Sequence, residues 1–258
     1  MKIEFLNLTT GYAKTPMIKN LNFVLESETS TCVLGANGIG KTTLFKTLLG
    51  LIDIVDGDIL IDGKSIKRMN SKEIALALSY VPQAKNYTYQ YSVLDIVLMG
   101  RAMYIDKFSE PSKKDIEISK KVLGQLGLYD YKDRMYSELS GGEQQVVLVA
   151  RALAQEANFI VMDEPASNLD FGNQKKLIDA INMLKESGKG VLMASHSPDH
   201  AFACCSNVIL IFQDRTVTYG TTKEMLNASN LKEVYGVGIN ILTGVGENGE
   251  TIQSCILC

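Results

Sequence analysis

A glycine-rich loop that ends in a lysine is the first feature of the sequence that could perform chemistry. It follows the short apolar stretch 31–34 and precedes a helical pattern over 42–49. Glycines let backbone N–H groups wrap around phosphates, and a helix N-terminus adds partial positive charge. The spacing fits the phosphate-binding pattern G-x-x-x-x-G-K-[ST] and predicts a nucleoside triphosphate site. Its residues are Gly35, Ala36, Asn37, Gly38, Ile39, Gly40, Lys41, Thr42 and Thr43.

Two side chains of this loop are suited to distinct tasks at a triphosphate. We expect Lys41 to reach the β- and γ-phosphates and Thr42 to give its hydroxyl to Mg²⁺. The alternative is an ordinary glycine-rich turn. The strand-like stretch before the loop and the helical pattern after it favour the phosphate-binding interpretation, because that is the context in which such a loop works.

An apolar stretch over 159–162 ends in two acids, Asp163 and Glu164. Ligands of open α/β sheets lie at the carboxyl ends of the strands. We therefore expect Asp163 to hold Mg²⁺, directly or through water, and Glu164 to orient and deprotonate an attacking water. Alone, two acids after a strand are typical of a solvated turn. His196 follows the apolar stretch 191–195 in the same way, and we expect it to donate to the γ-phosphate.

The sequence LSGGEQ over 139–144 discriminates between classes of phosphate-loop protein. By itself it is typical of a helix-capping box with a glycine pair. It lies, however, between the phosphate loop and the acidic strand. With this order of motifs the chain resembles the ATP-binding-cassette (ABC) ATPases, whose signature is LSGGQ or a close variant. Simple P-loop kinases and GTPases have no such motif.

The resemblance covers nearly the whole chain and implies roles for further residues. Tyr12 occupies the place of an aromatic that stacks on adenine, although it could equally be a packing residue at a strand end. Gln83 matches the glutamine that joins the core to a helical insert, and we expect it to take part in catalysis and in holding Mg²⁺. The stretch 167–170, which ends in Asp170, resembles a loop that reaches across a dimer and contributes to the nucleotide site.

The resemblance also implies a head-to-tail homodimer. Each ATP would be held by the phosphate loop of one copy and the signature of the other, through Ser140, Gly141, Gly142 and Glu143. Two departures from the family pattern affect details of the signature helix and its contacts. The stretch 144–147 lacks an arginine that the family often carries, and Ala166 replaces a frequent threonine. Neither removes an atom that the chemistry requires.

The elements that must position these residues can be predicted from hydrophobic periodicity and turn signals. Strands alternate with helices, which implies a mainly parallel α/β sheet with helices on both faces. The resemblance specifies a P-loop NTPase (RecA-like) core with N-terminal antiparallel strands and an inserted α-helical subdomain. We expect one domain over 1–258, with the core at about 1–84 and 155–258 and the helical subdomain at about 85–154. The expected strands are 2–8, 21–26, 31–34, 59–61, 158–162, 190–194 and 207–212, and the expected helices are 42–49, 71–77, 92–99, 112–126, 142–154, 172–186 and 198–204.

A finer resemblance points to a class of transporter. The stretches 91–101, 168–174 and 196–202 look like those of ATPases that drive importers of iron chelates, haem and cobalamin, and some molybdate and tungstate importers share the first. This implies integral membrane permease subunits as partners, a substrate-binding protein as an indirect one, and a permease docking surface at Gln83 and the segment 87–101. The competing class is a soluble cassette ATPase without a permease, such as an iron–sulfur cluster assembly ATPase. Repair-type cassettes carry long coiled-coil insertions, which do not fit here.

Composition limits the remaining possibilities. The 258 residues include 26 Lys plus Arg and 29 Asp plus Glu, giving a net charge of −3. A weakly acidic chain lacks the basic footprint of a general nucleic-acid binder. Its apolar runs are shorter than a membrane span and its start does not resemble a signal peptide, so we expect a cytoplasmic protein, peripheral on the inner face of the cell membrane. Five cysteines favour reduced thiols over a disulfide framework; a metal site including Cys255 and Cys258, or prenylation at the end, are the alternatives.

Overall fold

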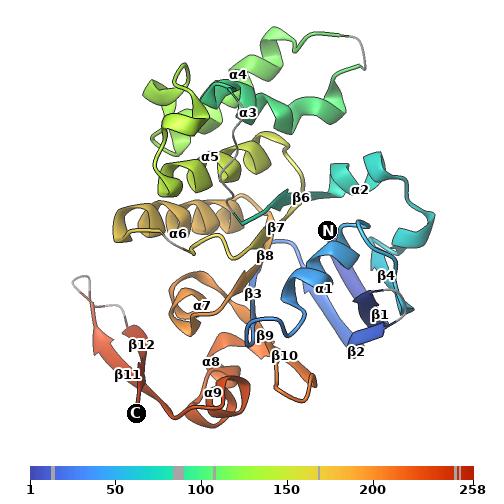
Figure 1. Ribbon diagram of the computed structural model, residues 1–258, viewed down its shortest axis with the longest axis vertical. Helices are drawn as coiled ribbons and strands as arrows, with labels where there is room; N and C mark the ends of the chain where they lie inside the picture. Colours follow the sequence, from blue (N-terminus) through green and yellow to red (C-terminus); the bar gives the residue numbers. More distant parts are fainter. Residues whose placement is uncertain (13–14, 84–89, 107–108, 168, 247–248, 250) are drawn as a thin grey trace.

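The computed structural model describes residues 1–12, 15–83, 90–106, 109–167, 169–246, 249 and 251–258. Within these ranges a six-stranded sheet runs through the middle of the molecule (Figure 1). Its order is β10-β9-β3-β8-β7-β6, and its members are parallel except for β10, which is antiparallel to β9. The strands are β3 (Ser30–Leu34), β6 (Leu78–Val81), β7 (Phe159–Asp163), β8 (Gly190–Ser195), β9 (Asn207–Ile211) and β10 (Val217–Thr221).

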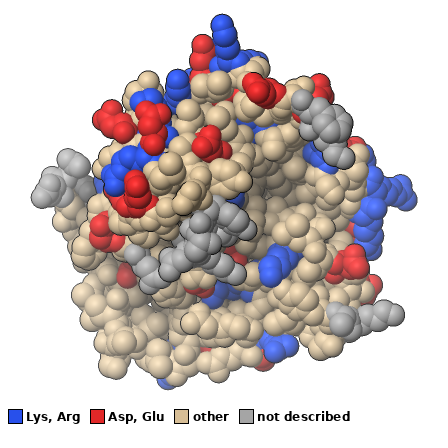
Figure 2. Space-filling model, turned by 45° about the horizontal axis from the view of Figure 1, so that its top comes forward, with Lys and Arg blue, Asp and Glu red and all other residues tan. Residues whose placement is uncertain are grey.

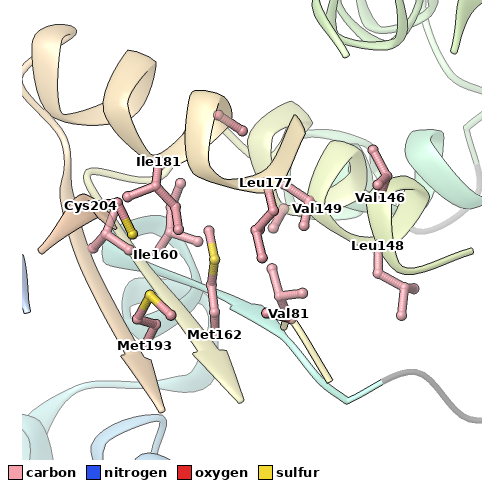
Figure 3. Packing of buried hydrophobic residues seen from close by; sticks show 14 of the residues in the cluster. Val81, Val146, Leu148, Val149, Ile160, Met162, Leu177, Ile181, Met193 and Cys204 are labelled. Carbon is pink, nitrogen blue, oxygen red and sulfur yellow. The ribbon is translucent and has the colours of Figure 1, made fainter. Parts of the chain in front are cut away.

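Both faces of this sheet are buried. Every residue of β3, β7 and β8 is buried, which is expected where helices cover a parallel sheet on both sides. On one face, Figure 3 shows Met162 and Met193 of the sheet beneath Leu177 and Ile181 of α6 (Phe171–Glu186). The other face packs against α1 (Lys41–Leu48), through residues such as Phe45. The predicted mainly parallel α/β sheet is confirmed.

A second sheet is antiparallel and has the order β2-β1-β4-β5. Its strands are β1 (Lys2–Tyr12), β2 (Thr15–Glu26), β4 (Asp56–Ile61) and β5 (Lys64–Ser65). β1 and β2 are longer than the expected strands 2–8 and 21–26. The pairing register shifts after Phe5, Leu8 and Thr10, and Asn7 has a positive φ of 47°. These irregularities break the alternation of buried and exposed residues by which strand length is predicted.

A helical part lies at one end of the molecule (Figure 1). It contains α3 (Val93–Leu98), η2 (Met99–Tyr104), α4 (Lys113–Gln125), η3 (Tyr129–Tyr131), η4 (Tyr136–Glu138) and α5 (Gly141–Ala154). β6 is not among the strands expected from the sequence; it is a mostly buried strand that directly follows α2 (Ser71–Ala77), which comes after η1 (Ile66–Arg68). The four residues of β6 follow α2 without a turn signal, and their strand structure comes from pairing with β7. The predicted division of the chain between core and helical subdomain remains a prediction.

Arg101 links η2 to α4 and to the segment between α5 and β7. It is 3% exposed, and it donates to Asp115 of α4 over 3.0 Å and to Glu156 over 2.7 Å. It also donates to the carbonyl of Ala154 over 2.7 Å, at the end of α5. A buried guanidinium with these partners fixes the junction between helical part and sheet, because removing one partner would leave a charge buried and unpaired.

The last elements were not predicted from the sequence. After α7 (Pro198–Cys204) and β10 come α8 (Thr222–Met225), α9 (Ala228–Tyr235) and a hairpin of β11 (Ile239–Val245) and β12 (Thr251–Leu257). The hairpin lies at the opposite end of the molecule from the helical part (Figure 1). Among the described residues, all five cysteines have free thiols and no group of three or more His, Cys, Asp or Glu side chains is placed to hold a metal ion. Within the same part of the chain, each helix is too short or too polar to cross a membrane.

Candidate active site

The glycine-rich loop connects β3 to α1, as the spacing predicts. Gly38 and Gly40 have positive φ values of 75° and 125°, which residues with side chains rarely adopt. Gly35 has little room for a side chain, since a Cβ there would lie 3.0 Å from the Ile39 side chain and 3.1 Å from the carbonyl oxygen of Ile211. The glycines therefore set the path of the loop, which brings its backbone to the N-terminus of α1.

Lys41 lies inside the loop that precedes it. Its side chain is buried, and its Nζ donates to the carbonyl of Gly35 over 2.7 Å and to that of Ala36 over 3.4 Å. The same ammonium lies 3.6 Å from Oε1 of Glu164. These contacts hold a positive charge over the loop. That is the arrangement expected for a lysine that contacts phosphate oxygens.

Thr42 and Asp163 meet although they are 121 residues apart in the sequence. The Thr42 hydroxyl donates to Oδ2 of Asp163 over 2.8 Å, and the Tyr80 hydroxyl donates to the same oxygen over 3.5 Å. Burial raises the pKa of the Asp163 carboxyl, and the hydrogen bond from Thr42 opposes this shift. Hydroxyl and carboxylate oxygens are hard ligands that suit Mg²⁺. A buried carboxylate beside a hydroxyl thus fits the predicted cation.

Glu164 and His196 lie side by side at the carboxyl ends of neighbouring strands β7 and β8. His196 Nδ1 is 3.8 Å from Oε2 of Glu164, and the His196 side chain is 54% exposed. Glu164 has a φ of 49°, in the left-handed region that is uncommon for residues other than glycine. The backbone turns sharply at this residue, which directs its carboxylate back toward Lys41 and His196. Strained backbone of this kind is enriched at functional sites.

Gln83 reaches the site through an intermediate residue. Its Nε2 donates to the Ser167 hydroxyl over 3.3 Å, and Ser167 donates to the carbonyl of Glu164 over 2.8 Å. Gln83 is thus linked to the loop that follows β7, and its predicted part in holding Mg²⁺ remains a prediction. Sequence reasoning missed Tyr80, which contacts Asp163 directly. The signal that could have found it is β6, whose end lies beside that of β7 in a parallel pair.

The signature residues lie at the start of α5. Ser140 and Glu143 form the predicted capping box: Glu143 Oε2 accepts from the Ser140 backbone and hydroxyl over 2.8 Å each, and the Ser140 hydroxyl accepts from the Glu143 backbone over 3.3 Å. Hydrogen bonds from Ser140 lower the pKa of the Glu143 carboxyl. Gly142 packs against α6, because a Cβ at this position would lie 2.5 Å from Nδ2 of Asn173. Asp170 accepts from the backbone N–H of Asn173 over 2.8 Å and caps α6.

The structure brings only part of the predicted site together within one chain. Among the described residues, the hollow at the phosphate loop is lined by Met17, Asn37, Gly38, Gly40, Lys41, Thr42, Thr43 and Glu164. The four signature residues and Asp170 are absent from this lining, and so are Asp163 and His196, which contact the lining residues Thr42 and Glu164. Tyr12 is also absent from it; it ends β1 and is 45% exposed.

A family model described as ABC transporter matches residues 18–167, which is more than half of the chain. This chain belongs to the ABC transporter ATP-binding family. Members of the family bind ATP and hydrolyse it to power transport, and this ABC ATPase is accordingly an ATP-hydrolysing enzyme. The loop around Lys41 and the acids after β7 are the residues of its chain suited to that reaction.

Relatives of this ABC ATPase extend over almost its full length. The manganese transport system ATP-binding protein MntB of Bacillus subtilis is 36% identical and is aligned over 93% of this chain and 94% of its own. A probable iron chelatin transport ATP-binding protein of Helicobacter pylori is 34% identical, with 91% and 93% covered. A solved structure described as an inward-facing putative metal-chelate type ABC transporter superposes with a TM-score of 0.88 at 28% identity, over 99% of this chain and 97% of that chain.

Proposed function

We propose that the chain is the ATPase subunit of a prokaryotic ABC importer and acts as a head-to-tail homodimer. One observation supports the dimer: contacts join Asp163, Glu164 and His196 to the phosphate loop at one sheet edge, whereas the signature begins α5 in the helical part and is not among the described residues that line the hollow at this loop. A second copy can supply the missing wall. Its α5 N-terminus would then direct backbone N–H groups at the γ-phosphate.

The contacts within one copy support a division of labour at the nucleotide. Lys41 would neutralise phosphate oxygens, and Thr42 and Asp163 would hold Mg²⁺, which supplies charge neutralisation on the β- and γ-phosphates. Glu164 would take the proton of the attacking water, while His196, beside it, would donate to the γ-phosphate. Tyr12 would stack on adenine, and Gln83 would relay the state of the site through Ser167.

A hollow between the core and the helical part supports docking of a permease. It is lined by residues at the end of α1, in α2, at β6 and at the junction of α3 with η2. Leu51 and Met99 line it and are 62% and 42% exposed. Figure 2 shows the face with the helical part turned toward the viewer, where a hollow is surrounded mainly by uncharged side chains. Exposed apolar side chains around a groove are typical of a surface that binds a partner.

This hollow refines the docking segment expected at 87–101. Tyr87 and Tyr89 lie outside the described residues. Met99 lines the hollow, but Arg101 is buried and paired with acids, so it is a structural residue and not part of an exposed surface. In this proposal the permease holds the chain on the inner face of the membrane, and a substrate-binding protein acts through the permease.

The transported substrate is proposed to be a metal chelate. The structural likeness to a putative metal-chelate transporter over nearly the whole of both chains supports this class, as does the relative named for iron chelatin transport. Manganese, for which another relative is named, was not among the substrates expected from the sequence, and it adds an alternative beside molybdate and tungstate.

The experiment that tests this function combines purification with uptake. A tagged chain is purified from native membranes, and cells lacking the chain are assayed for uptake of radiolabelled iron chelate, manganese and molybdate. We expect an integral membrane protein to co-purify in fixed ratio and uptake of one label to be lost. A chain that stays in the soluble fraction with all three uptakes intact would reject the importer in favour of a soluble cassette ATPase.

A further inference from the structure

The C-terminal hairpin presents an apolar face that the described part of the chain leaves about half exposed. Asn240 pairs with Ile256, Leu242 with Ser254 and Gly244 with Ile252, so these six residues share one side of the hairpin. Leu242, Ile252 and Ile256 are 54%, 49% and 44% exposed. This side is the outer face of the hairpin.

The opposite side of the hairpin fixes its orientation. Ile239 is buried, and Ile241 and Cys255 pack against the main core of the molecule. The Cys255 backbone N–H donates to Oδ1 of Asp199 over 2.8 Å, which ties β12 to the first turn of α7. The hairpin is therefore held on the fold, and the direction of its outer face is a property of the folded chain.

Charge is absent from both strands of the hairpin. The stretches 239–245 and 251–257 contain no Lys, Arg, Asp or Glu. Exposed strands of monomeric proteins are commonly protected by charged side chains, especially lysine, that prevent association. An uncharged apolar face can meet a copy of itself across a two-fold axis without placing like charges together.

Two other occupants fit this surface less well. The stretch 236–258 contains no Lys or Arg and two Glu, whereas anionic lipid surfaces attract basic segments. The hairpin also lies at the opposite end of the molecule from the helical part, beside which the hollow proposed for the permease lies (Figure 1). The outer face is therefore a poor match for a lipid surface or for the permease as its binding partner.

The hairpin is continuous with the surface that the proposed dimer uses. One hollow is lined by Ser167, Phe171 and His196 on one side and by residues 252–254 on the other. Phe171 is 90% exposed, directly after the loop that is expected to reach across the dimer. A second copy that covers this loop would therefore also approach the hairpin.

We propose that the outer face of the hairpin binds the same face of a second copy and holds two copies together whether or not ATP is bound. The inference rests on the head-to-tail dimer of the proposed function, to which it adds a second contact. The nucleotide sandwich forms and opens with each ATP, whereas the hairpin contact keeps the two sites within reach of each other and raises their effective concentration.

The test measures self-association of the full chain by sedimentation without nucleotide. Leu242→Asp and Ile256→Asp place like charges across the proposed axis, and Ser254→Arg does so without removing an apolar side chain. Leu6→Asp is the matched control, because Leu6 is 42% exposed on β1 of the other sheet. We expect the wild type and the control to dimerise, and the three outer-face variants to associate at least about ten-fold more weakly while keeping their circular dichroism spectrum. A monomeric wild type, or variants that dimerise like the control, would overturn the inference.

Two further experiments distinguish the hairpin contact from the ATP-driven dimer and from lipid binding. In a Glu164→Gln background, ATP should still drive dimerisation of Leu242→Asp at high protein concentration. If that ATP-driven dimer forms while the hairpin variants behave like the control, only the hairpin inference fails; if it forms in no variant, the proposed function fails instead. Phosphatidylglycerol vesicles are used in the second experiment, and vesicle binding that Leu242→Asp abolishes without any change in self-association would assign the outer face to lipid.

Discussion

The ammonium group of Lys41 lies 3.6 Å from the carboxylate of Glu164, across the hollow at the phosphate loop. This pair brings a phosphate-binding charge and the expected catalytic base together. Binding of a triphosphate would give Lys41 new anionic partners and leave the Glu164 carboxylate facing the γ-phosphate. The two residues can thus be tested separately, one through affinity and the other through turnover.

Glu164→Gln should nearly abolish hydrolysis while ATP binding survives. The amide keeps the shape of the side chain but loses the basic oxygen, and general-base catalysis typically contributes about 10²–10⁴-fold. The variant should accumulate as an ATP-bound dimer, visible by chromatography with ATP. Glu186→Gln, at the exposed end of α6, is the control that should keep full turnover. Wild-type turnover in Glu164→Gln would reject the role assigned to this carboxylate.

Lys41→Ala should weaken nucleotide binding itself. A hydrogen bond from a charged donor is worth about 1.5–3 kcal/mol, which predicts a roughly ten- to hundred-fold rise in the ATP dissociation constant. Titration calorimetry measures this directly. Lys46→Ala, one turn further along α1, removes an equal charge and should leave the affinity unchanged. Equal affinity in both variants would mean that Lys41 is not the phosphate ligand.

The residues of the phosphate site could be predicted from the sequence because their constraints are local. Gly38 and Gly40 adopt backbone angles that favour glycine, and Asp163 and Glu164 directly follow a buried apolar strand. Tyr80 could not be found in this way. Its approach to Asp163 depends on the pairing of β6 with β7, and the sequence separation of 83 residues leaves no local trace.

The C-terminal end was unpredictable for a related reason. β11 and β12 carry no motif, and their apolar residues occur on both sides of the hairpin, so they show no clean alternation. The hairpin is held in place by packing against the core and by the hydrogen bond that the Cys255 backbone N–H donates to the Asp199 carboxylate. Longer elements with one buried side, such as α4 and α6, were predicted within one or two residues at each end.

Asp163→Asn should stabilise the nucleotide-free chain at neutral pH while it removes hydrolysis. Burial raises the pKa of Asp163, so the folded chain binds this proton more tightly than the unfolded chain, and ionisation costs stability at every pH above that pKa. The gain should be about 0.5–2 kcal/mol, the usual size for one stabilising substitution. Thermal melts should show the advantage at pH 7 and a narrowing of it as the pH falls toward 4. If Asp163→Asn melts at the same temperature as the wild type at pH 7, the hydrogen bonds from Thr42 and Tyr80 already offset the cost of burying the Asp163 charge.

Ser140→Arg should block hydrolysis in a way that a partner chain can repair. Each variant alone, Ser140→Arg or Lys41→Ala, lacks one half of both composite sites. In a mixed dimer, the intact loop of the first faces the intact signature of the second, which restores one site in two and predicts about a quarter of wild-type activity in an equal mixture. Ser140→Arg also removes the capping box of α5, so its effect on stability needs a control. Asn70→Arg removes the capping box of α2, which is away from the nucleotide, at a similar cost of about 1 kcal/mol, and it should keep its activity. Mixing that restores no activity would contradict a site shared between copies.

Charge placed at the hollow beside the helical part, or elsewhere on the expected docking segment, should uncouple the ATPase from transport. Met99→Asp and Tyr91→Asp alter residues of the expected docking segment that are 42% and 43% exposed, and Leu51→Asp alters the end of α1, where the side chain is 62% exposed. None of the three contacts the hollow at the phosphate loop, so the isolated subunit should keep its ATPase activity within about two-fold, as expected of exposed sites. A buried charge at the centre of a protein interface commonly costs several kcal/mol, so co-purification with the permease and substrate uptake should both fall at least about ten-fold. Leu6→Asp serves again as the control with intact uptake. Arg101 is unsuitable for this test, because it is buried between Asp115 and Glu156 and its replacement would disturb the fold itself.

Normal uptake in all three variants would place the permease on another surface of the chain.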